Sequence, residues 1–450
     1  MAQATRMFRS SMYVTSLTIL GSILGLTVQV LVARSFGIGS VVDAYFFSLS
    51  WPLLFAGITS SALSFTLIPK IAALALDDKA NIGEYIWSRC FGLIIAIVFF
   101  SPIAFLLTWT QLNSLESNSA LKNATDLDLL CLLAWISAGF LVIKNYLVAV
   151  LHGLKFHVLA ATLSLFPYIS MTLGLALLPA TRLGIVMPLV AMIGGMVLAI
   201  VSGSIILFVR YGFFHSWTAS IKSAVELLVD LPKAGLALSC FSTYSIVDAY
   251  IAPLFGAGSL TTISLIQRFI IGVGNLAISG ISSVVIHIFI GQIHELNYTG
   301  FTRSVWIYTV GIFFGSLAMF SPLYFVSFEA VLGFFNIEMN DGLDVERLQS
   351  YVVTMIPGAC AMLTSVVLMR VLFCFERGRV IGILIGLLWT GLYSLIAMTN
   401  LGLGLDSLTS AYTQSWLIVA SILLVTVSLV ARKEMANKLV SETQKLPNKA

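Results

Sequence analysis

The sequence predicts an all-α polytopic membrane protein with about twelve transmembrane helices in two parallel six-helix lobes. Of its 450 residues, 59% are hydrophobic and only 10% are charged, whereas a soluble domain carries about 25% charged residues. Apolar runs of about twenty residues recur from end to end, and each is long enough to cross a hydrocarbon core of about 30 Å. Two short motifs also recur in both halves of the chain. Together these observations predict a duplicated helical bundle that is embedded in a bilayer.

Apolar windows mark the predicted spans one by one. They cover residues 10–34, 41–67, 88–109, 127–151, 157–179, 184–209, 233–255, 259–291, 303–328, 349–375, 380–400 and 408–431. Between the sixth and seventh windows the chain is polar and compatible with a helix, so we expect this segment to lie along the membrane interface. The predicted domains are an N-terminal lobe at 1–214, an interfacial linker helix at 215–232, a C-terminal lobe at 233–431 and a basic tail at 432–450.

The basic residues outside these spans fall mostly on one side of the membrane. Only Arg34, Lys122, Arg182 and Arg347 lie in the loops on the other side. Seventeen lie on the side that holds both chain ends, namely Arg6, Arg9, Lys70, Lys79, Arg89, Lys155, Arg210, Lys222, Lys233, Arg303, Arg377, Arg379 and the five of the tail. Because Lys and Arg concentrate in cytoplasmic loops, we expect both termini in the cytoplasm. An even number of spans also requires the two ends to share a side.

An internal repeat links the two halves. The segment Phe36–Ser40 (FGIGS), between the first two spans, recurs as Phe255–Ser259 (FGAGS) between the seventh and eighth. Phe100–Phe105 (FSPIAF) in the third span recurs as Phe320–Phe325 (FSPLYF) in the ninth, at nearly the same offset. Each copy begins on the same face, so the repeats are parallel, and an axis along the membrane normal relates the halves. In transporters with this symmetry, substrates bind near the midplane between the repeats.

Five ionisable residues stand out within the spans, where each costs several kcal/mol unless it has a partner or a function. Asp248 and Arg268 lie at similar depths below the outer surface, on two helices joined by a tight turn. One interpretation is a structural ion pair between these helices. The other is a polar site in which Arg268 binds a phosphate oxygen, because a planar guanidinium suits that geometry. In this site Asp248 orients the guanidinium or carries a proton.

The other three charges have structural alternatives as well. Lys144 and Arg370 lie about six residues from the cytoplasmic ends of the fourth and tenth spans, at nearly equivalent places in the repeat. Their long side chains can extend to the headgroup region, or they can face a cavity and attract an anionic headgroup. Asp43 lies near the outer end of the second span, where capping of a helix N-terminus explains a carboxylate. The candidate cargo-binding residues are therefore Arg268, Asp248, Asp43, Lys144 and Arg370.

Sequence motifs of the common enzyme classes are absent. The chain has no G-x-x-x-x-G-K-[ST] loop for a nucleotide, no H-E-x-x-H zinc motif and no G-x-S-x-G nucleophile turn. An Asp-x-Asp pair at Asp126 and Asp128 is the exception, but no outer loop is long enough for the domain that a glycosyltransferase usually adds. We expect no enzyme activity, metal, cofactor or nucleic-acid partner.

The segment Val32–Phe47 (VARSFGIGSVVDAYFF), followed by Pro52-Leu53-Leu54, resembles the junction of the first two spans in the MviN/MurJ family of the MOP exporter superfamily. Gln267-Arg268-Phe269 resembles that family's Asp-Arg-Leu on span eight, whose arginine lines the central cavity. The resemblance implies a V-shaped pair of six-helix lobes in a bacterial inner membrane that flips an undecaprenyl-diphosphate-linked saccharide to the outer leaflet. The family's further cavity arginines on the first two spans are replaced here by Ser22, Val28 and Gln29.

The cargo is either lipid II or another polyprenyl-diphosphate-linked glycan, such as the repeat units that Wzx-type flippases carry. Membrane lipids and a coupling ion, H⁺ or Na⁺, are the other expected partners. The alternative function is that of a MATE-like exporter of small organic cations, which needs a membrane carboxylate in a cavity without excess positive charge. Asp248 fits that role if Arg268 points away. A scaffold that recruits wall-synthesis enzymes is a third hypothesis.

Overall fold

The computed structural model describes residues 2–77, 82–114, 127–177, 183–213, 216–227, 243–325, 345–375 and 377–445. Contacts divide the chain into two compact units, and the boundary between them falls at residue 265 or 266 within one long helix. The division into lobes at 1–214 and 233–431 stays a prediction.

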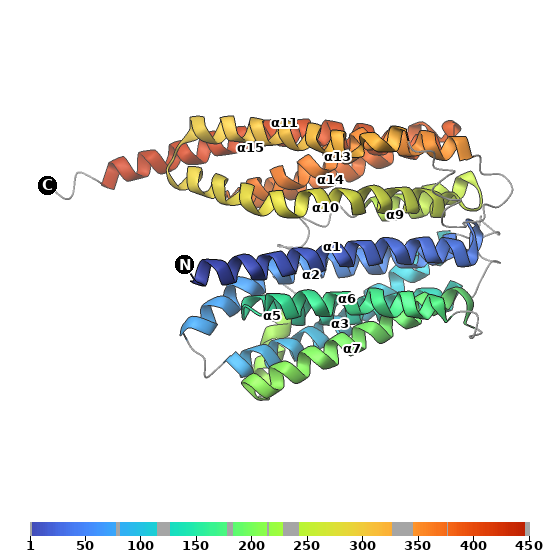
Figure 1. Ribbon diagram of the computed structural model, residues 1–450, viewed down its shortest axis with the longest axis horizontal. Coiled ribbons are helices and arrows are strands. Elements are labelled where there is room, and N and C mark those ends of the chain that lie inside the picture. Colours follow the sequence, from blue (N-terminus) through green and yellow to red (C-terminus); the bar gives the residue numbers. More distant parts are fainter. Residues whose placement is uncertain are drawn as a thin grey trace. The chain divides into compact units, whose positions relative to one another are not determined.

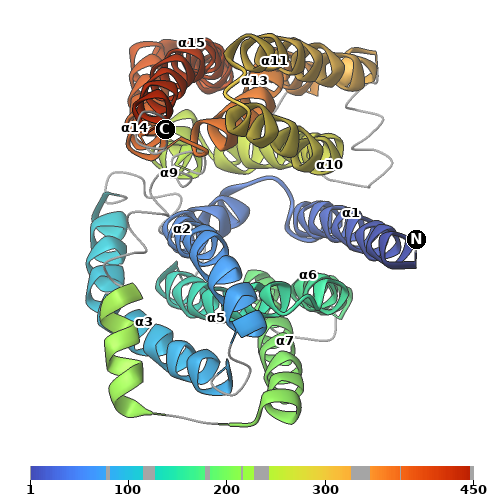
Figure 2. The ribbon, with the colours of Figure 1, turned by 90° about the vertical axis from the view of Figure 1, so that its left-hand side faces the viewer.

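The first unit is a bundle of long helices that lie alongside one another (Figure 1). Its elements are α1 (Ala2–Phe36), α2 (Ser40–Asp77), α3 (Ile82–Ser114), α5 (Leu127–Gly153), α6 (His157–Ala176), η2 (Gly184–Val186), α7 (Met187–Tyr211), a helix over 217–227, α9 (Tyr244–Ile251), η4 (Ala252–Phe255) and the first turns of α10 (Ser259–His294). Helix α2 packs along α5, and α6 packs against both α1 and α7. Figure 2 views this bundle from one end.

Small residues bring α6 and α7 close together. A Cβ atom added at Gly195 would lie 2.6 Å from the carbonyl oxygen of Phe166, and one added at Gly174 would lie 2.6 Å from the Cβ of Ala191. Membrane helices associate largely through such close backbone approach, because lipid tails are as apolar as the helices and give little hydrophobic drive. Helices α3 and α7 also expose large apolar side chains, among them Val98 and Val209. Such side chains are expected where a helix faces lipid.

The second unit contains the rest of α10 and the helices that follow it (Figure 1). Its elements are α11 (Tyr298–Phe320), η5 (Ser321–Tyr324), α13 (Val345–Leu372), α14 (Gly378–Thr399), η6 (Leu401–Leu403) and α15 (Leu405–Lys445). Helix α15 packs against both α13 and α14. The rings of Trp389 and Trp416 lie 4.5 Å apart between centroids, and both side chains are fully buried. The basic tail predicted at 432–450 continues α15 as a helix as far as Lys445.

The predicted fold class is confirmed: the chain is an all-α, multi-pass membrane protein. Within the described ranges, ten helices are long and apolar enough to cross a bilayer, and they match ten of the twelve predicted windows. The seventh window is represented by the shorter apolar stretch Tyr244–Phe255. The eighth window, 259–291, lies within the single long helix α10 (Ser259–His294). The seventh window begins at 233, and its residues up to 242 lie outside the described part of the chain. The segment predicted to lie at the interface contains the helix over 217–227.

Candidate functional site

Asp43 lies in the first turn of α2 and is completely buried. Its Oδ2 accepts a hydrogen bond of 2.6 Å from the backbone N–H of Gly258, and its Oδ1 accepts two more of 2.6 Å from the N–H and hydroxyl of Thr261. Gly258 and Thr261 flank the start of α10, so Asp43 caps a helix that begins more than 200 residues later. Asp43 does cap a helix N-terminus, as one interpretation of the sequence predicted. The capped helix is α10, however, and not α2 itself.

The repeated glycine motif explains why this cap can form. Gly37 has φ 73° in the first copy, and Gly256 and Gly258 have φ 113° and 87° in the second. These positive φ values favour glycine, and they turn the chain sharply before α2 and α10. The second turn points the first N–H groups of α10 at the Asp43 carboxylate. A negative charge at a helix N-terminus is also favoured by the helix dipole.

The face of α2 that carries Asp43 also contacts α9, further toward the bilayer interior. Phe47 lies one turn after Asp43, and its ring packs edge-on against Tyr250 of α9 with 6.2 Å between centroids. Trp51 lies a further turn on, and its indole N–H donates to the Tyr250 hydroxyl at 3.2 Å. The sequence did not single out Tyr250 or Thr261. The spacing of Asp43, Phe47 and Trp51 by four residues was the available signal, because it places all three on one helix face.

Lys144 on α5 presents the opposite case. Its side chain is only 7% exposed, and it has no hydrogen-bond or ion-pair partner among the described residues. Its neighbour Asn145 donates to the Ser60 hydroxyl of α2 at 2.6 Å, and Tyr146 donates to the carbonyl of Ile86 on α3 at 2.6 Å. The next two residues on α5 thus have side-chain partners, whereas the Lys144 ammonium has none among the described residues. Burial of an unpaired charge is costly, so this position is suited to an anion.

The remaining predicted site residues differ in their surroundings. Asp248 is buried on α9 at 1% exposure. Arg268 is half-buried on α10. Arg370 is exposed in the last turn of α13, and both of its interpretations stay predictions. The Lys144 side chain is buried, and both of its interpretations stay predictions. The assignment of these residues to cargo binding stays a prediction.

The structure was compared with known proteins. No protein-family model matches the sequence, and no curated protein matches it. Among solved structures, the inward closed conformation of the lipid II flippase MurJ aligns with a TM-score of 0.70 at 17% identity, covering 95% of this chain and 92% of that one. An inward-facing multidrug resistance MATE family transporter of the MOP superfamily aligns with a TM-score of 0.71 at 15% identity, covering 93% and 95%. An outward-facing MATE family transporter of the same superfamily aligns with a TM-score of 0.63 at 15% identity, covering 95% of this chain and 96% of that one.

These likenesses establish the fold. The chain shares the fold of these two solved structures over nearly its whole length. At 15–17% identity the alignments show the fold alone and assign no activity to this chain.

Proposed function

We propose that this protein is a transporter that moves an undecaprenyl-diphosphate-linked saccharide from the cytoplasmic to the outer leaflet by alternating access. The observation that carries the proposal is Lys144, a buried cation on a membrane-spanning helix that has no partner among the residues that the structure describes. A diphosphate is a compact anion that would compensate this charge, and its polyprenyl tail can stay in lipid while the headgroup crosses. Arg268, Asp248 and Arg370 are the further residues that we assign to the cargo.

The alternative, a MATE-like exporter of small organic cations, needs an available carboxylate. Asp43 is poorly placed for this role, because it is completely buried and its carboxylate already accepts three hydrogen bonds of 2.6 Å from the start of α10. Asp248 remains the candidate carboxylate for that function. An unpaired lysine in the same bundle would repel a cationic substrate, which favours the flippase.

The proposed location is a bacterial inner membrane with both termini in the cytoplasm. The distribution of Lys and Arg supports it, with seventeen on the side of the termini and four on the other. Reporter fusions or cysteine labelling at the two termini test the orientation directly, and labelling from the periplasm would contradict it.

Transport is tested in proteoliposomes with a fluorescent undecaprenyl-diphosphate saccharide and a membrane-impermeant quencher. We expect the wild-type protein to expose the inner-leaflet pool to the quencher. Lys144→Met should lower the rate at least about tenfold, because a charge-assisted hydrogen bond contributes about 1.5–3 kcal/mol. Lys144→Arg keeps the charge and should retain part of the rate. Liposomes made with different saccharides on the same diphosphate would identify the glycan.

Lys433→Met is the matched control, because Lys433 is an exposed cation on α15 and its loss should leave the rate unchanged. Correct folding of each variant is checked by size-exclusion chromatography. Equal rates for the wild type and Lys144→Met would contradict the proposed role of Lys144. Uptake of organic cations by inverted vesicles, with no movement of the lipid, would establish the alternative function.

A further inference from the structure

The helix over 217–227 runs crosswise to the long helices of the first unit (Figures 1 and 2). Ser216 precedes it, and its hydroxyl accepts a hydrogen bond of 3.4 Å from the N–H of Ala219, as a helix cap does. A short helix perpendicular to membrane-spanning helices is oriented along the membrane surface. The interfacial linker at 215–232 stays a prediction, and the direction of this helix is compatible with it.

This helix is held tightly on α3. A Cβ atom added at Gly92 would lie 2.8 Å from the carbonyl oxygen of Ser220 and 2.9 Å from the backbone nitrogen of Ala224, so only glycine permits this approach. The indole N–H of Trp87 donates to the carbonyl of Gly212 at 2.9 Å. The ring of Phe213 packs on Trp87 with 5.2 Å between centroids. The position of the crosswise helix is therefore fixed by backbone contact and by an aromatic cluster.

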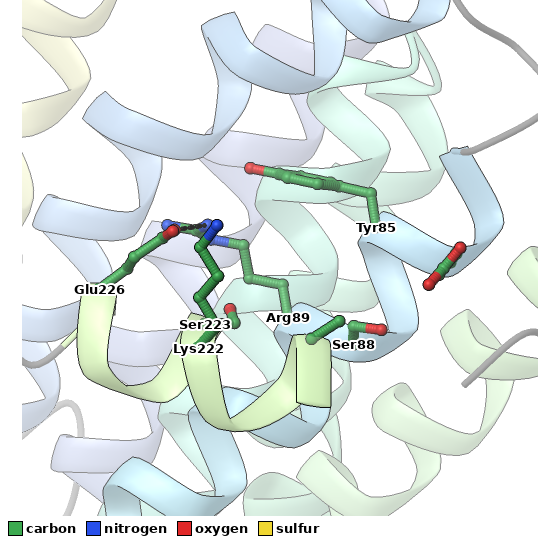
Figure 3. Close-up of a pocket in the computed structure, with 8 residues that line it drawn as sticks. Tyr85, Ser88, Arg89, Lys222, Ser223 and Glu226 are labelled. Atoms are coloured by element: carbon green, nitrogen blue, oxygen red, sulfur yellow. Dashed lines mark hydrogen bonds and ion pairs between the residues drawn. The ribbon is translucent and has the colours of Figure 1, made fainter. Parts of the chain in front are cut away.

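A cavity of about 280 Å³ lies between α3 and the crosswise helix. Figure 3 shows Tyr85, Ser88 and Arg89 on the α3 wall and Lys222, Ser223 and Glu226 on the other. Glu84 and Ala219 complete the lining. The Arg89 guanidinium donates to Glu226 at 2.9 Å and lies 5.6 Å from the centre of the Tyr85 ring.

Several polar groups in this lining lack partners. The hydroxyl oxygens of Tyr85, Ser88 and Ser223 are buried and form no hydrogen bond, and both serines are more than nine-tenths buried. Lys222 and Glu84 have no ion-pair partner among the described residues. A buried hydroxyl without a partner costs about 1–3 kcal/mol, so three of them beside one cavity indicate a ligand with hydrogen-bond acceptors.

The outer face of the crosswise helix is apolar. Trp217, Ile221 and Val225, spaced four residues apart, are each more than half exposed. Exposed tryptophan and aliphatic side chains on a surface helix are typical of insertion at the boundary between headgroups and acyl chains. The cavity beneath this stripe is therefore at the depth of lipid headgroups.

We propose that this cavity is a binding site for the headgroup of a zwitterionic phospholipid, one that carries a phosphodiester and a primary ammonium group. The hydroxyls of Tyr85, Ser88 and Ser223 and the ammonium of Lys222 donate to the phosphodiester oxygens. The carboxylate of Glu84 and the solvent-facing side of Glu226 bind the lipid ammonium. The acyl chains extend beside Trp217, Ile221 and Val225. The site goes beyond the proposed transport function, since it requires no cargo.

The charges of the lining decide between headgroups. Two cations, Arg89 and Lys222, are balanced by two carboxylates, Glu84 and Glu226, and Arg89 is already paired with Glu226. A purely anionic headgroup would meet Lys222 but also the uncompensated charge of Glu84. A headgroup with one charge of each sign compensates both.

The test is native mass spectrometry of the full-length, detergent-purified protein after delipidation and addition of a single lipid. The lipids are phosphatidylethanolamine and phosphatidylglycerol with the same acyl chains. We expect the wild type to bind phosphatidylethanolamine at least about fivefold more tightly. The Tyr85→Phe, Ser223→Ala double variant should bind it about tenfold more weakly, because it removes two donors to a charged oxygen and retains both side-chain shapes.

Glu84→Gln provides the sharper test, because it removes the charge that binds the ammonium and repels an anionic lipid. We expect it to abolish the preference between the two lipids, whereas Glu295→Gln, an exposed glutamate on the second unit, should leave the preference intact. Equal binding of both lipids by the wild type would overturn the proposal. Unchanged binding by the double variant, with an unchanged size-exclusion profile, would overturn it as well.

Discussion

Asp43 and Lys144 are both buried charges on membrane-spanning helices of the first unit, but their surroundings are opposite. Asp43 has three hydrogen-bond donors at 2.6 Å, and Lys144 has no partner within the described chain. A buried charge with complete hydrogen bonding stabilises a particular arrangement of helices. A buried charge without any partner destabilises the protein and is retained for a ligand. The difference supports a structural role for Asp43 and the role in cargo binding that we propose for Lys144, although the sequence presents both as intramembrane charges.

The largest expected effect is that of Asp43→Ala. It leaves the N–H groups of Gly258 and Thr261 buried without an acceptor, so the free energy of unfolding should fall by about 3–5 kcal/mol. Thermal unfolding in detergent, followed by size exclusion, measures the loss. Asp43→Asn retains the shape and one acceptor oxygen and should lose less. An unchanged melting temperature for Asp43→Ala would show that the cap has no structural role.

Lys144→Met should raise the free energy of unfolding, whereas Asp43→Ala should lower it. Replacing an unpaired buried ammonium with an apolar side chain of similar length removes its desolvation penalty, so stability should rise by about 2 kcal/mol. The same detergent unfolding assay measures this gain, while the proteoliposome assay should show loss of transport. A variant that is both less stable and inactive would instead assign Lys144 to the structural class.

Thr261→Val tests the cap on Asp43 by changing a hydrogen-bond donor instead of the carboxylate. It removes one of the three hydrogen bonds to Asp43 and keeps the volume of the side chain. We expect a loss of about 1–2 kcal/mol in the free energy of unfolding, since the bond joins a hydroxyl to a charged acceptor. Thr262→Val is the neighbouring control, because the Thr262 hydroxyl donates only to its own helix, to the carbonyl of Gly258 at 2.8 Å. An equal effect of both substitutions would contradict the specific role of Thr261.

The smallest expected effect is that of Trp51→Phe. It removes the 3.2 Å hydrogen bond to Tyr250 at the inner end of the contact that begins at Asp43. A neutral hydrogen bond contributes about 0.5–1.5 kcal/mol, and the lower part of this range is expected because the aromatic packing remains. Tyr250→Phe should give a similar loss, and the double variant should lose no more than either single one. Additive losses would show that the two side chains do not act as a pair.

The positions of the helices were predictable because hydropathy is a local property of the chain. Ten windows coincide with helices that can cross a bilayer. The glycine repeat also located the turns before α2 and α10, since glycine is favoured where φ is positive. The crosswise helix was predicted from its polar sequence, but its cavity was not, because Tyr85 and Ser223 are distant in sequence and carry no motif.

The sequence by itself determined the all-helical membrane fold, the repeated turns and the presence of five charges within the spans. Only the tertiary structure decided which of these charges has partners. The cap on Asp43 joins groups that are 215 and 218 residues away, and the isolation of Lys144 depends on the neighbours that α2, α3 and α5 place around it. The physical reason is that the cost of inserting a side chain depends on its own chemistry, whereas the compensation of its charge depends on which helices pack together.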